Sequence, residues 1–399
     1  MNTPKIRFKG FTDDWEQRKL GDVFEQTTNF VDPNKKEIEL WSLTVEDGLT
    51  PKSERYNREF LVKKDTGFKE VRSGDIVYNP MNMTLGAVGY NGMSKSVAVS
   101  GYYTTMITNE GYDSYYINTW LKSPQAMALY KTFATGSLIE KQRVQFPTLS
   151  IIPATFPQYE EQVRIGYYFM RLDHLITLHQ RKCDETKQLK KFMLQKMFPK
   201  NGEKNPEIRF EGFTDDWEQR KLGEVVGIYD GVHQTPQYQD SGIMFLSVEN
   251  ITTLKSEKYI SEEAFERDYK VYPEKGDILM TRIGDVGTTN VVQTKEKVAF
   301  YVSLALLKPK EINSYFLSNA MKTSVFQKGL RERTLVTAIP QKINKDEIGR
   351  VNVFITNNAE EQKKIGDYFT ALDHLITLHQ RKCEKLKELK KYMLQNMFV

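Results

Sequence analysis

Two matched pairs of metal-binding residue types are the first feature of this sequence that could support chemistry. His179 and Cys183 are four residues apart, and so are His379 and Cys383, so each pair would share one face of a helix. If an antiparallel helix pair brought them together, the four side chains could form a tetrahedral zinc site. The simpler interpretation is that they are core residues of a helix–helix seam, with histidine specifying the register. We therefore expect no metal.

Motifs for catalysis on nucleic acid are missing. The sequence contains no G-x-x-x-x-G-K-[ST] phosphate-binding loop, so ATP hydrolysis by this chain is not expected. An adenine methyltransferase would carry a glycine-rich cofactor loop and an Asp/Asn-Pro-Pro-aromatic string. The nearest match, Asn79-Pro80-Met81, lacks the second proline and the aromatic residue, and a strand that ends at a proline explains it. We predict a chain without catalysis of its own.

Residue types that read base edges follow two matching turns. Gly74-Asp75-Ile76 and Gly276-Asp277-Ile278 look like turns that lead into strands. Arginine can bind guanine with two hydrogen bonds, and asparagine or glutamine can bind adenine in the same way. Solvated surface charge is the alternative for each residue. The candidate DNA-binding residues are Asn79, Asn82, Lys141, Gln142, Arg143, Arg282, Arg331, Arg333, Gln341 and Lys342.

An internal duplication positions these candidates. Residues 4–23 and 206–225 differ only at Lys5/Glu207, Lys9/Glu211 and Asp22/Glu224, and the string LDHLITLHQRKC occurs at both 172–183 and 372–383. Between these flanks the likeness falls to a few anchors. Two repeats of about half the chain each predict two domains rather than a solenoid of short units.

Residues 160–198 and 360–398 contain no proline and are rich in good helix formers, so each predicts a rod of roughly 57 Å. Apolar and semi-polar residues recur at alternating spacings of four and three, which is typical of a coiled-coil seam. Residues 199–206 read as a linker bounded by prolines. We expect the rods to pair antiparallel about a pseudo-twofold axis, with one variable domain at each end. The predicted seam is Ile165, Phe169, Leu172, Ile176, His179, Cys183, Thr186, Lys190, Met193 and Met197, with its equivalents from Ile365 to Met397.

The variable segments predict mixed α and β structure, so the fold class is α+β. We expect strands at 38–45, 75–79, 96–108, 243–248, 277–283 and 298–307, and helices at 115–121, 125–133 and 314–330.

Charge and composition set the broad class. A net charge of +5, from 57 basic and 52 acidic residues, gives only weak support for a polyanionic partner, so nucleic-acid contacts must come from local patches. Two cysteines fit a reducing compartment. The sequence has neither an apolar run of about 20 residues nor an N-terminal signal peptide, and we expect a cytoplasmic location.

The chain resembles the specificity subunit of type I restriction-modification systems over its whole length. The matching elements are the opening from Trp15 to Val23, repeated from Trp217 to Val225, the Gly-Asp-Ile turns, and Glu-Glu-Gln at 160–162 and 360–362 followed by Leu-Asp-x-Leu-Ile. The family's late loop often has Gly-Ser/Thr followed by Gln and Lys. Here Gly136-Ser137 is followed at a distance by Gln142-Arg143, and Thr337 precedes Gln341-Lys342 without the glycine.

The resemblance implies a division of labour. Residues 1–157 and 207–357 would be target-recognition domains that each read half of a split DNA sequence, and residues 158–198 and 358–399 would be conserved spacer helices. Two modification subunits would bring S-adenosylmethionine for adenine methylation, and two restriction subunits would bring ATP and Mg²⁺. The alternatives are a coiled-coil scaffold that binds only proteins and a self-sufficient methyltransferase with disguised motifs. The recognised bases and the spacer length do not follow from the sequence.

Overall fold

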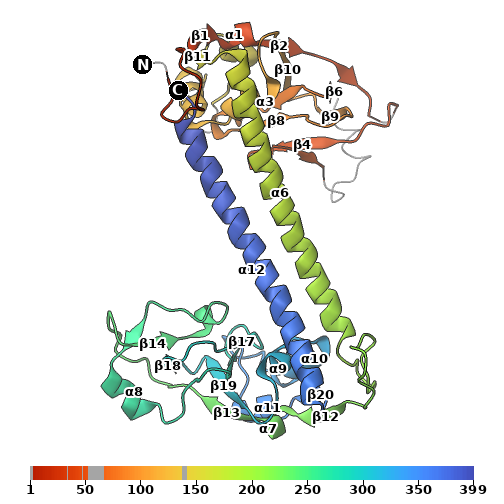
Figure 1. Cartoon of the computed structure of the whole chain (residues 1–399), viewed down its shortest axis with the longest axis vertical. Coiled ribbons are helices and arrows are strands. Elements are labelled where there is room, and N and C mark those ends of the chain that lie inside the picture. Colours follow the sequence, from red (N-terminus) through yellow and green to blue (C-terminus); the bar gives the residue numbers. More distant parts are fainter. Residues whose placement is uncertain (1–2, 34, 47, 53–66, 137–141) are drawn as a thin grey trace. The chain divides into compact units, whose positions relative to one another are not determined.

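The chain forms two compact units that each combine a globular region with parts of two long helices (Figure 1). The computed structural model describes residues 3–33, 35–46, 48–52, 67–136 and 142–399. Unit 1 is Met1–Gln180 with Arg381–Val399, and unit 2 is Arg181–Gln380. The long helices are α6 (Tyr159–Lys196) and α12 (Ala359–Asn396). The division between the units falls within both helices, whereas the domain boundaries predicted from the sequence set the helices apart, and those boundaries stay a prediction.

In unit 1 the central sheet has the order β2-β10-β7-β8 and is antiparallel throughout. Its strands are β2 (Phe24–Thr27), β10 (Thr104–Thr108), β7 (Ile76–Tyr78) and β8 (Val88–Tyr90). A second sheet, β3-β6-β9, is formed by β3 (Phe30–Val31), β6 (Phe68–Val71) and β9 (Val97–Ser100), and β4 (Trp41–Thr44) pairs with β5 (Gly48–Pro51). Near the termini of the globular region, β1 (Glu16–Lys19) pairs with β11 (Pro153–Phe156).

The short helices of unit 1 are α1 (Leu20–Val23), η1 (Met83–Leu85), α3 (Ser114–Trp120), α4 (Pro124–Phe133) and α5 (Phe146–Ser150). The side chains of Asp113 and Ser123 accept hydrogen bonds from backbone amides in the first turns of α3 and α4. Such N-caps satisfy amides that a helix leaves unpaired at its start, and Pro124 fits the first turn because its missing N–H is not needed there.

Unit 2 repeats this plan. The sheet β13-β19-β16-β17 corresponds to the central sheet of unit 1, β15-β14-β18 forms a second sheet, and β12 pairs with β20. The strands are β12 (Glu218–Lys221), β13 (Val226–Asp230), β14 (Ile243–Leu246), β15 (Tyr259–Ile260), β16 (Ile278–Thr281), β17 (Thr289–Val291), β18 (Val298–Phe300), β19 (Leu304–Pro309) and β20 (Asn352–Ile355). The helices are α7 (Leu222–Val225), η3 (Val248–Asn250), α8 (Glu262–Asp268), α9 (Ser314–Ala320), α10 (Ser324–Arg333) and α11 (Lys345–Gly349).

Several predicted elements are divided in the structure. The single helix expected at 314–330 is wrong, because Thr323 caps a new helix: its side chain accepts from the amide of Phe326, and α9 ends at Ala320. The strand expected at 96–108 is two strands, β9 and β10, which belong to different sheets. The strand expected at 298–307 is likewise β18 and β19. In each case the predicted element continued through a turn, which periodicity alone does not reveal.

The Gly-Asp-Ile sequences form the predicted turns. Gly74 and Gly276 have φ values of 90° and 98°, a region that glycine adopts without steric cost. The Asp75 carboxylate accepts a hydrogen bond from the Arg72 amide at 2.8 Å, and Asp277 accepts one from the Glu274 amide at 2.8 Å. These aspartates close the turns that lead into the buried strands β7 and β16.

The long helices pack against each other within each unit through the predicted seam. Ile165, Phe169 and Leu172 are buried in unit 1, and Cys183 and Met197 are buried in unit 2. The Cys183 thiol lies 4.0 Å from the Ile376 carbonyl oxygen of α12, so this cysteine is a core residue of the seam. The predicted α+β fold with a long-helix pair is confirmed.

Two residues beyond the end of each long helix, a phenylalanine packs in the core of a globular region. In unit 2 the Phe198 ring lies 5.7 Å from the Trp217 ring and 5.6 Å from the Phe316 ring, centroid to centroid. In unit 1 the Phe398 ring lies 5.7 Å from both the Tyr116 and the Phe169 rings. The C-terminal residues of the chain therefore complete the core of unit 1.

In each repeat, a buried glutamate at the start of the long helix binds side chains of the N-terminal segment. Glu161 accepts two hydrogen bonds of 2.7 Å from Arg7 and one of 3.2 Å from the Trp15 indole. Glu361 accepts from Arg209 at 2.6 and 2.9 Å and from the Thr356 hydroxyl at 2.6 Å. The N-terminal segment of each repeat is thereby fixed to the start of the long helix.

Candidate nucleic-acid interface

Two loops of unit 2 that carry candidate base-reading residues lie against each other. One loop follows β16 and the other follows α10. The Gly284 amide donates to the Gln341 carbonyl at 2.8 Å, and the Gln341 side chain donates back to the Gly284 carbonyl at 2.9 Å. The Ile343 amide donates to the Arg282 carbonyl at 3.0 Å. Candidates about 60 positions apart in the sequence therefore share one surface.

Arg282 is held inward at this surface. Its side chain pairs with the Asp230 carboxylate, and its Nε donates to the Ile343 carbonyl at 3.2 Å. The residue is only 7% exposed, and burial lowers the pKa of its guanidinium. Arg282 would have to leave Asp230 to reach a base, so in this conformation it positions the loop.

The second loop of unit 2 has exposed aliphatic side chains at its tip. Backbone hydrogen bonds between Leu335 and Lys342 close the loop, and Val336 and Ile339 are 68% and 100% exposed. Arg331 and Lys342 are exposed beside this tip. Apolar side chains can contact thymine methyl groups, so the combination of exposed aliphatic and cationic groups suits a DNA groove.

Arg333 is more constrained than Arg331. Its Nη1 donates to the Gly329 carbonyl of the same helix at 3.1 Å, and its Nε lies 3.9 Å from the Glu347 carboxylate. The side chain is half-buried. Arg331 is therefore the more exposed and less constrained arginine of α10.

Unit 1 brings its candidates together in the same way. The loop after β7 contains Asn79 and Asn82, and its Pro80 carbonyl accepts a 2.9 Å hydrogen bond from the Val144 amide. Arg143 pairs with Thr135 through two backbone hydrogen bonds of 3.0 and 2.9 Å. Asn82 and Arg143 are exposed and Gln142 is partly exposed, whereas the Asn79 side chain accepts from the Met81 amide at 3.0 Å. Lys141 lies outside the described residues.

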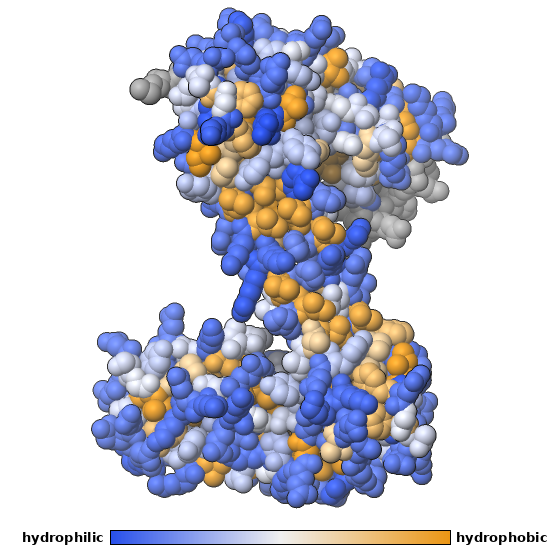
Figure 2. Space-filling view, in the orientation of Figure 1, coloured by the Kyte–Doolittle hydropathy of each residue, from blue (hydrophilic) through white to orange (hydrophobic). Residues whose placement is uncertain are grey.

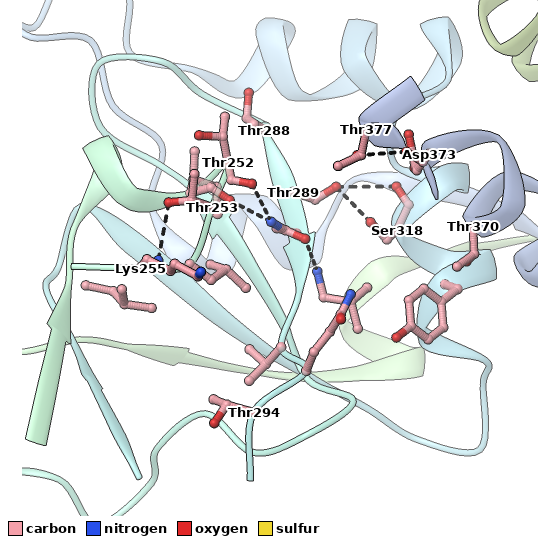
Figure 3. A pocket seen from close by; sticks show the side chains of 18 of the residues that line it. Thr252, Thr253, Lys255, Thr288, Thr289, Thr294, Ser318, Thr370, Asp373 and Thr377 are labelled. Carbon is pink, nitrogen blue, oxygen red and sulfur yellow. Dashed lines mark hydrogen bonds between the residues drawn. The ribbon is translucent and has the colours of Figure 1, made fainter. Parts of the chain in front are cut away.

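A cavity of about 800 Å³ opens in unit 2, and its lining includes Thr288, which follows the loop after β16. Figure 3 shows hydroxyl groups from several elements around it, including Thr252 and Thr253 after η3, Thr289 on β17, Ser318 on α9, and Thr370 and Thr377 on α12. Lys190, Lys255, Lys322 and Asp373 supply its ionisable lining. Lys190 donates to Asp373 at 2.5 Å.

Apolar side chains also lie exposed along the long helices (Figure 2). In unit 2 these include Leu189, Phe192, Leu375 and Leu378, with exposed fractions of 38–48%. In unit 1 Leu389 and Tyr392 are 41% and 55% exposed. Leu189 and Leu389 occupy equivalent positions of the two repeats, as do Phe192 and Tyr392. Folding does not require exposed leucines to be retained in both copies, so this helix face is a candidate docking surface for a partner.

The described residues contain no group of three or more His, Cys, Asp or Glu side chains arranged to hold a metal ion. Cys383 instead donates toward the Ile176 carbonyl at 4.0 Å and the Gln180 side-chain oxygen at 3.7 Å. Among the described helices, none has the length and apolar composition needed to cross a membrane.

Comparison with known proteins identifies the architecture. Residues 214–388 match the family model of the type I restriction modification DNA specificity domain. The second repeat of this chain therefore matches the type I restriction modification DNA specificity domain. It is 22% identical to the specificity subunit of the type I restriction enzyme MjaVIII from Methanocaldococcus jannaschii, and the match covers 95% of this chain and 91% of that protein.

Solved structures of specificity subunits share this fold. The S subunit of a type I restriction-modification system from M. genitalium matches with a TM-score of 0.68 at 15% identity, covering 100% of this chain and 99% of that chain. A chain from a structural study of assembly and conformational transition of the type I system matches with a TM-score of 0.51 at 19% identity, covering 95% of this chain and 96% of that chain.

Sequence reasoning placed the base-reading candidates of this specificity subunit on two loops per repeat but missed three features. Neither the Asp230 partner of Arg282 nor the exposure of Ile339 has a local sequence signal. The third feature is a partly buried lysine at equivalent positions of both repeats, Lys122 and Lys322. Its signal was available, because both lysines follow the Ser-Tyr anchors by the same spacing.

Proposed function

We propose that this specificity subunit reads a split DNA target, with one half of the target read by each unit. The observation that carries the proposal is that two units of the same fold place a pair of adjoining loops at the same position and fill these loops with different residues. Asn82 stands in unit 1 where unit 2 has Gly284, and Arg143 stands where unit 2 has Lys342. Different side chains on one scaffold give different base preferences.

Direct readout needs side chains that are free to reach base edges from a rigid support. Backbone hydrogen bonds hold both loops of each unit, while Asn82, Arg143, Arg331 and Lys342 are exposed. The remaining candidates, Asn79, Gln142, Arg282, Arg333 and Gln341, hold the loops or are partly buried. We assign base contacts first to the exposed set.

The repeated helix face would hold two modification subunits, one on each repeat. Leu189 with Leu389 and the Phe192/Tyr392 pair offer apolar contacts that both copies share. Two equal docking sites related by an internal repeat fit two copies of the same partner. Two restriction subunits would join the same complex.

Catalysis would belong to the partners. S-adenosylmethionine would be bound by the modification subunits, and ATP and Mg²⁺ by the restriction subunits, so purified specificity subunit should neither bind S-adenosylmethionine nor methylate DNA. The direct test is coexpression with a modification subunit followed by genome-wide mapping of methylated adenines. A split motif is expected. Methylation without any split motif contradicts the proposal, and methylation by the purified chain alone would show a self-sufficient enzyme.

A further inference from the structure

Each unit holds a partly buried lysine at the contact between its globular region and its long helices. In unit 2, Lys322 follows α9 and lines the cavity with Lys190, Asp373 and Tyr315. The equivalent residues of unit 1 are Lys122, Lys390, Asp173 and Tyr115. The neighbours of the lysine differ between the repeats, Leu121 against Met321 and Ser123 against Thr323, yet the lysine is present in both.

These clusters contain more positive than negative charge. Lys190 donates to Asp373 at 2.5 Å in unit 2, and Lys390 donates to Asp173 at 2.5 Å in unit 1, where the Tyr115 hydroxyl also donates to Asp173 at 2.9 Å. Each cluster therefore has one carboxylate for two ammonium groups, and the carboxylate is paired with Lys190 in unit 2 and with Lys390 in unit 1. Lys322 forms no ion pair within the described part of the chain.

The pKa values of both lysines are lowered mainly by desolvation and further by the neighbouring ammonium group. Burial, followed by the neighbouring ammonium of Lys190, lowers the pKa of Lys322 to about 8, and Asp373 offsets the effect only in part. Burial and Lys390 lower the pKa of Lys122 to about 8 in the same way. Buried charges in proteins are normally paired, so a retained, unneutralised lysine indicates an anion that binds from outside.

The cavity beside Lys322 suits an oxyanion. Hydroxyl-bearing side chains from three parts of the unit face it, among them Thr252, Thr294 and Thr370 (Figure 3). Its ionisable lining of Lys190, Lys255, Lys322 and Asp373 contains three cations and one anion.

The cavity is also next to the candidate base-reading surface. Strand β17 starts at Thr289, and Thr288 and Thr289 line the cavity, while Gly284 of the preceding loop holds Gln341. Gly284 and Gly287 have φ values of 79° and 103°, so this segment turns and spans less than about 13 Å, the length of four extended residues, which is under about four base pairs of duplex. A duplex on these loops would therefore carry its phosphates within reach of the cavity.

We propose that Lys322, together with Lys190, binds a backbone phosphodiester of the recognised DNA, and that Lys122 with Lys390 forms the equivalent site of unit 1. The inference rests on the proposed function. It adds that residues at the junction of the globular region and the long helices hold a DNA phosphate in place. The phosphate replaces the missing negative charge, so bound DNA keeps both lysines protonated. DNA affinity should then fall as the pH rises through about 8, because the free lysines lose the proton that binding requires.

The test uses the assembled complex of specificity and modification subunits and measures DNA affinity across a salt series. One lost phosphate contact lowers the slope of log K against log salt by about 0.9, so we expect this change in Lys322→Met and about twice the change in Lys122→Met/Lys322→Met. The methylated motif should stay unchanged, and the pH dependence above 8 should be reduced. Lys322→Arg should retain the slope. Lys270→Met is the matched control, since Lys270 is an exposed lysine of unit 2 outside the cavity lining.

Each other outcome is decisive. An unchanged slope in Lys322→Met, in a complex whose wild-type form binds DNA sequence-specifically, overturns the inference and leaves the proposed function standing. Loss of modification-subunit assembly in Lys322→Met overturns it as well, since the anion would then be a protein carboxylate. Protection of wild-type chain by inorganic phosphate with an unchanged DNA slope would identify a free-phosphate site instead. If wild-type complex shows no sequence preference, the proposed function itself fails.

Discussion

Lys190 Nζ lies 2.5 Å from Asp373 Oδ1 and joins α6 to α12 within unit 2. The Lys190 side chain is 15% exposed and that of Asp373 is 50% exposed, so the pair is only partly screened by water. Lys390 and Asp173 repeat the contact in unit 1 at 2.5 Å. Both repeats therefore have the same Lys–Asp ion pair between the long helices, in addition to the apolar contacts of the seam.

Asp373→Asn should weaken unit 2 modestly. The substitution leaves Lys190 without its carboxylate, and an ion pair that is half exposed contributes about 1 kcal/mol. Calorimetric melting of Asp373→Asn, Lys190→Met and the double variant measures the coupling. A double variant as destabilised as the sum of the two single variants would show that the residues do not interact.

Substitution of Phe192, on α6, and of Phe198, in the segment after α6, should distinguish an effect on partner binding from an effect on stability. Phe198→Ala empties a site in the unit 2 core beside Trp217 and should lower the free energy of unfolding by about 3–5 kcal/mol. Phe192 is 48% exposed, so Phe192→Ala should leave the melting temperature nearly unchanged and weaken the modification subunit's binding. Titration calorimetry with that subunit checks the second effect. Equal destabilisation by both substitutions would contradict the assignment of an exposed docking face.

The buried lysines should give the chain an unusual alkaline stability profile. Because the folded pKa of Lys122 and of Lys322 is about 8 and the unfolded value is about 10.4, the unfolded chain binds more protons between these limits. The free energy of unfolding should therefore increase as the pH rises from about 8 to 10.4. The penalty is fully present below pH 8. Lys322→Met should raise the melting temperature at pH 7 and flatten the rise above pH 8, and a lower melting temperature at pH 7 would argue against an unneutralised buried ammonium.

Arginines on the recognition loops should each affect one half of the target. Arg331→Ala in unit 2 and Arg143→Ala in unit 1 each remove an exposed guanidinium beside the loops. Loss of a bidentate base contact costs about 1–3 kcal/mol, so each variant should relax one position in a different half of the methylated motif. Methylated-adenine mapping of the two variants measures this. Uniform weakening on all sequences would assign the arginine to phosphate binding instead.

The sequence predicted the symmetric parts of this protein better than the recognition loops. Near-identical flanks and the seam from Ile165 to Met197 predicted the helix pair, because apolar spacing reports directly which face a helix buries. Arg282 was predicted as a base reader, yet its guanidinium pairs with Asp230, which is 52 residues earlier in the chain. Such a partner depends on the pairing of β13, β19 and β16, which no local pattern encodes. Lys122 and Lys322 were missed for a different reason, because lysine is ordinarily exposed, although their equal spacing after the Ser-Tyr anchors was a signal.

The central claim is that each unit reads its own half of a split target. The most direct measurement exchanges residues 24–155 for the corresponding segment of another specificity subunit, coexpresses the hybrid with the modification subunit, and maps the methylated adenines. We predict that one half of the motif changes to that of the donor while the other half, read by unit 2, stays the same. A motif that changes in both halves, or in neither, would contradict the account.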